Sequence, residues 1–314
     1  MLKLIALSRH ICYGCLVKMS PMNSQVTNFC TESSEDGASK TKDHLTVTSL
    51  QSRDPDTHDV AVTKMSMISP TVKHLVLSTS ERPVPFSFKA GQWIDMHIPG
   101  VDTVGGFSIT SSPMHLRRTG DIHLAVKNSE SPPSMWVHTK CQVGISVSIR
   151  VGGDFFLPPL DQFTMPTRIL FIAGGVGINP LSSMIMEIRD NITRSTIGAW
   201  KQLNVTLLFS AKTHEELIFR EEFDAIKAPW FKPIYFLTSS DKGYSSSSSV
   251  KYGRIQIQDV LAVLQQDDRS KGPNTNKALN QCHVYLCGPP DMTNTLQHCL
   301  KDMGVENIFF EKWW

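Results

Sequence analysis

The sequence predicts a protein of class β + α/β, in which an N-terminal antiparallel β-barrel precedes a C-terminal α/β domain with a parallel sheet. Short runs of alternating or β-branched residues, each closed by Pro, Gly or Asn, fill about 58–160 and are typical of a barrel or a sandwich. After Pro166 strand-like and helical runs alternate, which predicts a parallel sheet covered on both faces. The length of 314 residues also exceeds what one hydrophobic core usually holds.

The first residues are expected to precede the folded part of the chain. Residues 1–30 contain basic and apolar side chains but no Asp or Glu, which is typical of a mitochondrial transit peptide. The short apolar run Leu2–Leu7 also allows a secretory signal, and an untargeted tail is a third alternative. The polar residues 31–48 are interpreted as a linker, which leaves 49–164 for the barrel and 165–314 for the NAD(P)-binding α/β domain.

Strand patterns recur at short intervals in the barrel half. Only one short helix, Met135–Cys141, is expected to interrupt them, because the preceding Pro132–Pro133 pair is compatible with a helix start. The expected strands are Val72–Ser78, Gln92–Ile98, Phe107–Ser111, Ile122–Val126 and Ile145–Val151.

The α/β half contains apolar runs that alternate with amphipathic stretches of helical periodicity. The expected strands are Arg168–Ile172, Val205–Ser210, Ile234–Thr238 and Val284–Cys287. The expected helices are Leu181–Arg189, Glu215–Ala225, Ile257–Gln265 and Met292–Met303.

Composition and charge exclude several functions. The net charge of +2 is too small to indicate a nucleic-acid or acidic-lipid partner. No run of about 18 apolar residues offers a transmembrane segment. Seven cysteines without even spacing argue against a disulfide framework and favour a reducing compartment. The pair Cys12 and Cys15 has no second pair at metal-ligand spacing, so no metal site is expected.

A glycine-rich turn is the most informative local feature, in the segment ILFIAGGVGINPLSSM at 169–184. A strand that breaks into such a turn before a helix directs backbone N–H groups and the positive helix end at one point, where a pyrophosphate can bind. The spacing G-G-x-G-x-x-P departs from the G-x-G-x-x-G fingerprint, and no acidic residue follows at the usual distance, which disfavours an ordinary Rossmann dehydrogenase. A tight strand-to-helix connection without a ligand is the alternative.

A second turn of this kind lies near the end of the chain, in VYLCGPPDM at 284–292. In an open α/β sheet both turns would lie at the carboxyl ends of strands, which is the edge where ligands bind. Cys287 would then line the crevice, although from spacing alone a small buried hydrophobic residue is the more common role of a free cysteine.

Five segments occur in an order that resembles the ferredoxin-NADP reductase superfamily. They are AGQW at 90–93, FSITSSP at 107–113, the turn at 174–180, YGRI at 252–255 and CGPPDM at 287–292. The resemblance spans about 58–314 and implies a six-stranded barrel of the flavin-reductase type before the nucleotide domain. Within the superfamily it is greatest for a group of oxidoreductase NAD-binding domain-containing proteins with a similar aromatic tail.

The resemblance implies roles for individual residues. Those that would hold the pyrophosphate are Gly174, Gly175, Val176, Gly177, Ile178, Asn179 and Pro180. Those that would bind the flavin, with the rim turn Val151–Phe155 near it, are Phe107, Ser108, Ile109 and Ser111. Gly288 and Pro289 would lie beside the nicotinamide, and Trp313 would shield the flavin ring. The catalytic residues would be Cys287, Glu311 and Ser108.

One departure concerns the flavin. The superfamily usually has an arginine two residues before the aromatic of the flavin strand, where it binds the flavin phosphate, and this chain has Gly105 there. Losing such a contact costs about 1.5–3 kcal/mol. A replacement cation could come from Lys127, His138 or Lys140.

The function that the resemblance implies is a flavin-dependent oxidoreductase. It would take hydride from NAD(P)H onto FAD and pass electrons to a separate acceptor, either a protein or a small molecule. NAD is preferred over NADP because Glu215 and Glu216, beside Lys212, would repel a 2′-phosphate. The alternatives are a flavin-free NAD(P)-binding sensor or regulatory protein, and a dehydrogenase acting directly on a carbonyl, for which no acid is positioned near either turn.

Overall fold

A computed structural model describes residues 43–163, 166–194, 202–239, 249–265 and 282–312. The expected presequence, most of the expected linker and Trp313 lie outside these residues. Among the described residues, no helix is long and apolar enough to span a membrane.

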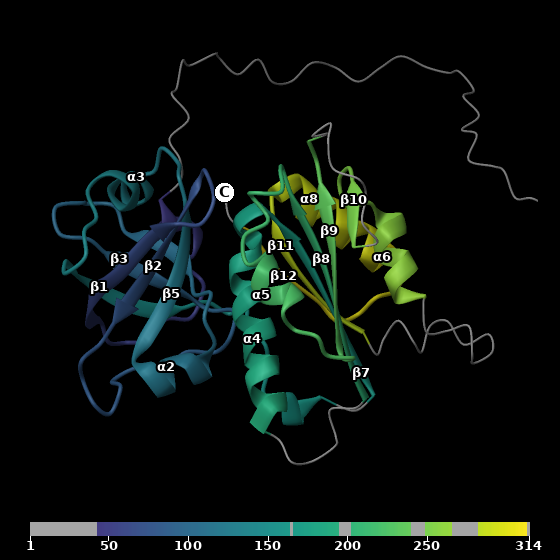
Figure 1. The fold of residues 1–314 in the computed structure, drawn as a ribbon, viewed down its shortest axis with the longest axis horizontal. Helices are drawn as coiled ribbons and strands as arrows, with labels where there is room; N and C mark the ends of the chain where they lie inside the picture. Colours follow the sequence, from purple (N-terminus) through teal and green to yellow (C-terminus); the bar gives the residue numbers. More distant parts are fainter. Residues whose placement is uncertain (1–42, 164–165, 195–201, 240–248, 266–281, 313–314) are drawn as a thin grey trace, which may run out of the picture. The chain divides into compact units, whose positions relative to one another are not determined.

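The first sheet is an antiparallel barrel with the strand order β4-β3-β6-β1-β2-β5. An antiparallel bridge between Ile109, which follows β4, and Leu124 of β5 joins the two edge strands and closes the barrel at that point. The strands are β1 (His58–Met67), β2 (Val72–Ser78), β3 (Trp93–His97), β4 (Gly105–Ser108), β5 (Asp121–Lys127) and β6 (Ser146–Gly152). The predicted six-stranded barrel is confirmed, and its strands are coloured purple to teal in Figure 1.

Side chains alternate across this sheet, as the pleat of a strand requires. On β3, Ile94 and Met96 point into the barrel core, so the neighbouring Trp93 and Asp95 point to the other face. That outer face is also fully buried at β3, since Trp93 and Asp95 are each 0% exposed. Something other than the barrel core therefore covers it.

Three helices accompany the barrel, α1 (His44–Val47), α2 (Pro113–Thr119) and α3 (Pro132–Thr139). The expectation of a single helix in this half is therefore wrong. α2 carries the signals of a helix in its sequence, because Ser112 accepts a hydrogen bond from the His115 N–H, Pro113 begins the first turn and Gly120 ends it with φ of 81°. α1 lies inside the segment that was expected to be linker.

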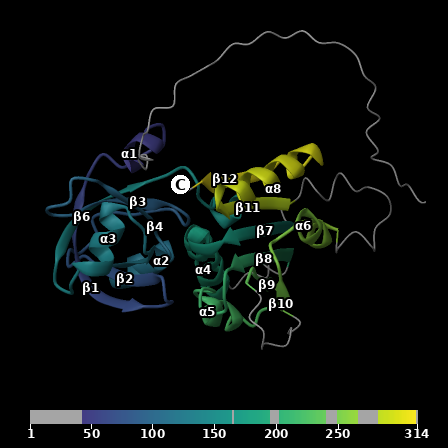
Figure 2. The ribbon, with the colours of Figure 1, turned by 90° about the horizontal axis from the view of Figure 1, so that it is seen from above.

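The second sheet is parallel throughout, with the order β10-β9-β8-β7-β11-β12. Its strands are β7 (Thr167–Gly174), β8 (Leu203–Ala211), β9 (Phe231–Leu237), β10 (Val250–Tyr252), β11 (Cys282–Gly288) and β12 (Ile308–Lys312). Its helices are α4 (Ile178–Arg194), α5 (Arg220–Asp224), α6 (Ile257–Leu264) and α8 (Pro290–Asp302). Helices α4 and α5 cover one face and α6 and α8 the other (Figures 1 and 2), which confirms the predicted α/β fold.

The two faces of β7 bury different apolar clusters. Phe171 packs in the cluster with α4 and α5, whereas Leu170 and Ile172 pack with α6 and α8. Burial on both faces explains why the strand is apolar without alternation. The expected helix Glu215–Ala225 is shorter than predicted, because Leu217 and Ile218 are buried in a non-helical approach to α5.

Three histidines pack together between β2, α2 and β5. The ring centroid of His123 lies 5.0 Å from that of His74 and 4.6 Å from that of His115. Burial lowers the pKa of all three, and the charges of its two neighbours contribute to lowering the pKa of His123 to about 4. The Ser112 hydroxyl just before α2 donates to Asp190 of α4 at 2.6 Å, so the cluster adjoins a contact between the barrel and the α/β domain.

We expect the free energy of unfolding to fall as the pH is lowered from about 6.5 towards about 4. In this range the unfolded chain binds more protons than the folded chain, because the folded-state pKa values of the histidines are lowered. His123 alone should account for about 2–3 kcal/mol. Urea denaturation across this range should show a flatter pH dependence for His123→Gln. His298→Gln, at an exposed position of α8, should keep the original dependence.

Candidate nucleotide-binding site

The first glycine turn forms the junction between β7 and α4. Gly175 has φ of +54°, a conformation that glycine adopts easily, and it opens a single 3-10 turn, Gly175–Gly177, before α4 begins at Ile178. A Cβ on Gly175 would have no atom within 4 Å, so this side of the turn is open. The Ile178 N–H already bonds the Gly175 carbonyl oxygen, so the continuous helical segment begins at Gly175. Its first backbone N–H groups lack helical partners and attract an anion.

The second turn lies directly against the first. Strands β7 and β11 are parallel neighbours, with Ala173 opposite Cys287. A Cβ on Gly177 would lie 2.2 Å from the Cys287 carbonyl oxygen, and one on Gly174 would lie 2.7 Å from Pro289 Cδ. Gly177 is thus required by close backbone packing and Gly174 by the side chains of Pro289 and Met292. The two turns share one edge of the sheet, as expected from the sequence.

Asn179 joins this turn to the barrel. Its Nδ2 donates to the carbonyl oxygen of Ala125 on β5 at 2.7 Å. Its Oδ1 is buried and accepts no hydrogen bond from any described residue. A buried acceptor without a partner is costly, so this atom is suited to receive an N–H or O–H group of a ligand at the turn.

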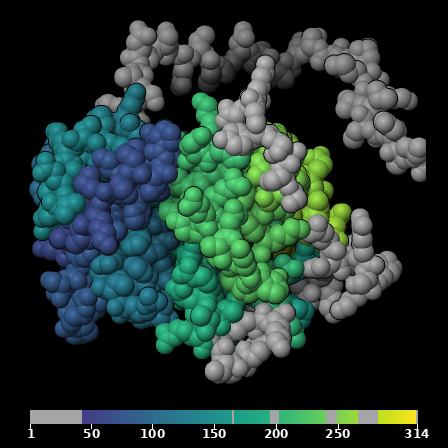
Figure 3. Space-filling model, in the orientation of Figure 1, coloured from purple at the N-terminus to yellow at the C-terminus, as the bar shows by residue number. Residues whose placement is uncertain are grey.

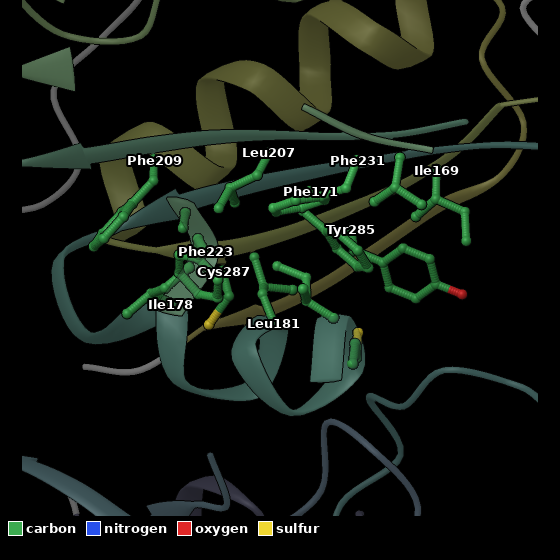
Figure 4. Close-up of a cluster of buried hydrophobic side chains, with 14 of the residues drawn as sticks. Ile169, Phe171, Ile178, Leu181, Leu207, Phe209, Phe223, Phe231, Tyr285 and Cys287 are labelled. Carbon is green, nitrogen blue, oxygen red and sulfur yellow. The ribbon is translucent and has the colours of Figure 1, made fainter. Parts of the chain in front are cut away.

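Cys287 is fully buried rather than exposed in a crevice. Its side chain belongs to the apolar cluster with Ile178 and Leu181, as Figure 4 shows. Burial, followed by the charge of Glu311 on the adjacent strand β12, raises the pKa of the thiol well above its usual value. The side chain is therefore a neutral thiol, and Glu311 is itself buried beside it.

Three of the barrel residues that the resemblance assigns to a flavin are buried or hydrogen-bonded within the protein itself. Ile109 is 0% exposed and lies in the barrel core. The Ser111 hydroxyl accepts from the His123 N–H, and the Ser111 carbonyl oxygen accepts from Ser183 of α4 at 2.7 Å. Ser108 is buried opposite Trp93 on β3.

Gly105, the position of the missing arginine, has no space for a side chain. A Cβ there would lie 2.5 Å from Cε2 of Phe107 and 2.8 Å from Cβ of Pro133. The Phe107 ring therefore lies over Gly105, against the start of α3. Because Pro132 and Pro133 begin α3, its first two positions have no N–H group to bind a phosphate.

The backbone of the rim turn Val151–Phe155 is hydrogen-bonded to residues 52–54 of the same chain. Gly153 N–H donates to the Ser52 carbonyl oxygen at 2.9 Å, Asp54 N–H donates to that of Val151 at 2.9 Å, and Ser52 N–H donates to Asp154 at 3.1 Å. This short pairing places residues 51–54 along the end of β6.

These contacts decide how far the barrel suits a flavin. The position of the phosphate cation is filled by Phe107 and Pro133, the nearby helix start has no donors at its first two positions, and the rim turn pairs with the chain's own residues. Of the suggested replacement cations, His138 is bonded to the Val126 carbonyl oxygen at 2.9 Å. Lys127 and Lys140 are exposed and remain candidates for that cation. At Gly105, at the start of α3 and at the rim turn, the residues present do not fit a flavin phosphate.

A buried ion cluster on the outer face of the barrel was not predicted from the sequence. Asp95 accepts from His44 Nε2 at 2.9 Å, Arg53 Nε at 2.9 Å and Arg150 Nη2 at 2.7 Å. Burial alone would raise the pKa of Asp95, but these three hydrogen bonds outweigh burial and lower it. The one signal in the sequence was an acidic residue within the apolar strand WIDMH.

The comparisons with known proteins agree with the geometry. Residues 171–298 match the family Oxidoreductase NAD-binding domain. Oxidoreductase NAD-binding domain-containing protein 1 of Danio rerio is 37% identical over 274 residues, which cover 87% of this chain and 97% of that protein. This chain belongs to the family of oxidoreductase NAD-binding domain-containing protein 1. The Homo sapiens member is 36% identical, over 78% of this chain and 76% of its own length.

Solved structures share the fold at lower identity. A ferredoxin NADP+ reductase from Neisseria gonorrhoeae with bound FAD and NADP aligns with a TM-score of 0.62 at 19% identity, over 83% of this chain and 100% of that chain. The flavohem-like FAD/NAD binding domain of nitric oxide dioxygenase from Vibrio cholerae O1 biovar El Tor aligns with a TM-score of 0.60 at 19% identity, over 81% and 98%. These structures confirm the predicted fold.

Proposed function

We propose that this member of the NAD-binding oxidoreductase family binds a reduced pyridine dinucleotide across the turns at 174–180 and 287–290. The observation that carries the proposal is the contact of Gly177 with the Cys287 carbonyl oxygen, because it joins both turns into one surface. The open side of Gly175 and the start of α4 would receive the pyrophosphate. Gly288 and Pro289 would then lie beside the nicotinamide.

The chain's own residues would hold and orient the nucleotide. Asn179 would accept a hydrogen bond from it through Oδ1 while Nδ2 keeps the turn tied to Ala125. Cys287, as a neutral buried thiol, would support the floor of the site by packing and would not act as a nucleophile. Hydride from the nicotinamide would pass to an acceptor whose identity sets the reaction.

Two finer functions follow from the nature of that acceptor. In the flavin-dependent oxidoreductase implied by the resemblance, FAD in the barrel would pass electrons to a separate protein or small molecule. In the flavin-free alternative, the chain would be an NAD(P)-binding sensor or regulatory protein. The filled space at Gly105 and the occupied rim turn favour the second.

NADH is expected to bind more tightly than NADPH, by about tenfold. Lys212 follows β8, and Glu215 lies close to it in the sequence and is exposed. Hydrogen bonds from Thr213 and from the Glu215 backbone lower the pKa of Glu215, so this side chain is ionised at neutral pH. Glu216 is held by the Thr71 hydroxyl at 2.9 Å. Titrations of both nucleotides, followed by calorimetry, test this.

Glu215→Gln should narrow the difference between the two nucleotides, whereas the exposed Glu306→Gln, beyond α8, should leave it unchanged. Failure of both nucleotides to bind would reject the proposed function itself. Tighter binding of NADPH would reject the preference for NAD alone.

We also propose that residues 1–30 direct the chain to mitochondria, on the basis of their basic, acid-free composition. A fusion of residues 1–48 to a fluorescent protein should accumulate in mitochondria. Secretion of the fusion would instead support the signal-peptide alternative.

A further inference from the structure

We infer that this chain is flavin-free because its own residues 43–54, here named the strap, and the ring of Phe107 cover the two sides of β4, the strand to which the resemblance assigns a flavin. The inference rests on the proposed function in one respect, since it concerns the flavin-free alternative given there. Helix α1 is the first part of the strap and lies over the barrel (Figure 2).

The strap covers β4 through His44. A Cβ on Gly106 would lie 2.2 Å from Cε1 and Nδ1 of the His44 ring, so the imidazole rests directly on the backbone of the strand. The same ring bonds Asp95 and meets the Trp93 ring edge-on, with centroids 4.8 Å apart. The imidazole therefore covers the side of β4 on which Gly106 lies.

The strap is anchored at both of its ends. At one end His44 bonds Asp95, which is 0% exposed. Further along, Arg53 bonds Asp95 through Nε and the Thr48 carbonyl oxygen through Nη1 at 2.7 Å, and it lies over the Trp93 ring. Removing the strap would expose Trp93 and leave Arg150 as the remaining cation on Asp95.

The other side of β4 is closed independently of the strap. Phe107 lies over Gly105 and against Pro133, where a side chain at 105 would otherwise reach a phosphate. Figure 3 shows the purple to teal residues of the barrel from the opposite side, on which β1, β2 and β5 lie. Binding a flavin requires that the strap, the Phe107 ring or both move away from β4. This movement should lower flavin affinity by about a hundredfold or more relative to an open site.

The test measures flavin content and nucleotide binding in the same sample of the purified full chain. We expect no absorption bands of a flavin and no change in flavin fluorescence when FAD or FMN is added to about 100 µM. Stoichiometric flavin in the purified protein, or binding at low micromolar concentration, would overturn the inference. NADH binding in the same sample is independent of this outcome, so loss of one does not imply loss of the other.

A variant tests the physical cause. His44→Ala combined with Arg53→Ala, which removes both anchors of the strap from Asp95, should bind FAD measurably, while circular dichroism confirms that the barrel is folded. Exposed positions supply the control, Val143→Ala combined with Met135→Ala, which should stay free of flavin. A folded double variant that still excludes FAD would show that these side chains are not what excludes it.

Discussion

Replacing Gly177 with alanine is expected to cost about 3 kcal/mol of folding stability and to abolish NADH binding. The added Cβ would lie 2.2 Å from the Cys287 carbonyl oxygen, 2.5 Å from its carbon and 2.7 Å from the Gly288 nitrogen. All three atoms are backbone at the end of β11, so they cannot move aside as a flexible side chain would. Relief would require the two turns to separate. Urea denaturation and NADH titration measure the two effects.

Alanine substitutions at two further glycines distinguish the effect of a steric clash from the effect of backbone strain. Gly175 and Gly100 have φ of +54° and +75°, and a Cβ on either would meet no atom within 4 Å. Each change to alanine should therefore cost about 1–2 kcal/mol from the left-handed backbone alone. Only Gly175→Ala should also weaken NADH binding, because its open side is where the pyrophosphate would approach. Equal NADH affinities for Gly177→Ala and the unchanged chain would contradict the shared surface of the two turns.

Asp95→Asn is expected to lower the free energy of unfolding by about 3–5 kcal/mol. The carboxylate is 0% exposed and bonds three cationic or ionisable side chains, so its neutral replacement leaves Arg53 and Arg150 without a counter-ion. Limited proteolysis should also cleave the strap faster in this variant, because both of its anchors meet at Asp95. Asp59→Asn is the control, since Asp59 lies on β1 but is exposed and bonds only the Ser148 hydroxyl among the contacts described.

The pH dependence distinguishes the Asp95 cluster from the histidine cluster. The folded-state pKa of Asp95 is lowered, so its contribution is present above the unfolded pKa of about 3.9 and is lost only as the pH falls below that value. Between about pH 7 and 5 the loss of stability should come from the histidines. Asp95→Asn should thus lower the free energy of unfolding throughout that range while the histidine-dependent fall persists, and disappearance of that fall in the variant would contradict this assignment.

Local patterns in the sequence were sufficient for most of the fold. β2 was predicted to the residue, because its β-branched run is bounded by clear breakers, and the turn at 174–180 was found because its glycines are required by backbone packing. α2 was not predicted although Ser112, Pro113 and Gly120 mark its ends, because a helix of seven residues is too short to show helical periodicity clearly.

The outer face of the barrel depends on contacts between residues far apart in the chain. Arg53 and Asp95 are 42 positions apart, and His44 lies in a segment too polar to suggest that it would cover a sheet. The same limit applies to the flavin residues, since Phe107 retains the aromatic type expected of a flavin site but is directed over Gly105. Fold and nucleotide turn were therefore predictable, whereas the filling of the barrel site was not.

Amide hydrogen exchange with and without NADH tests the central claim most directly. We predict slower exchange in peptides that cover the turns at 174–180 and 287–292 when NADH is present, with no change in the strap. A groove elsewhere on the described residues has a volume of about 410 Å³ and is lined in part by Lys89, Arg117 and Asp161. Protection of that groove, with the two turns unchanged, would contradict the account.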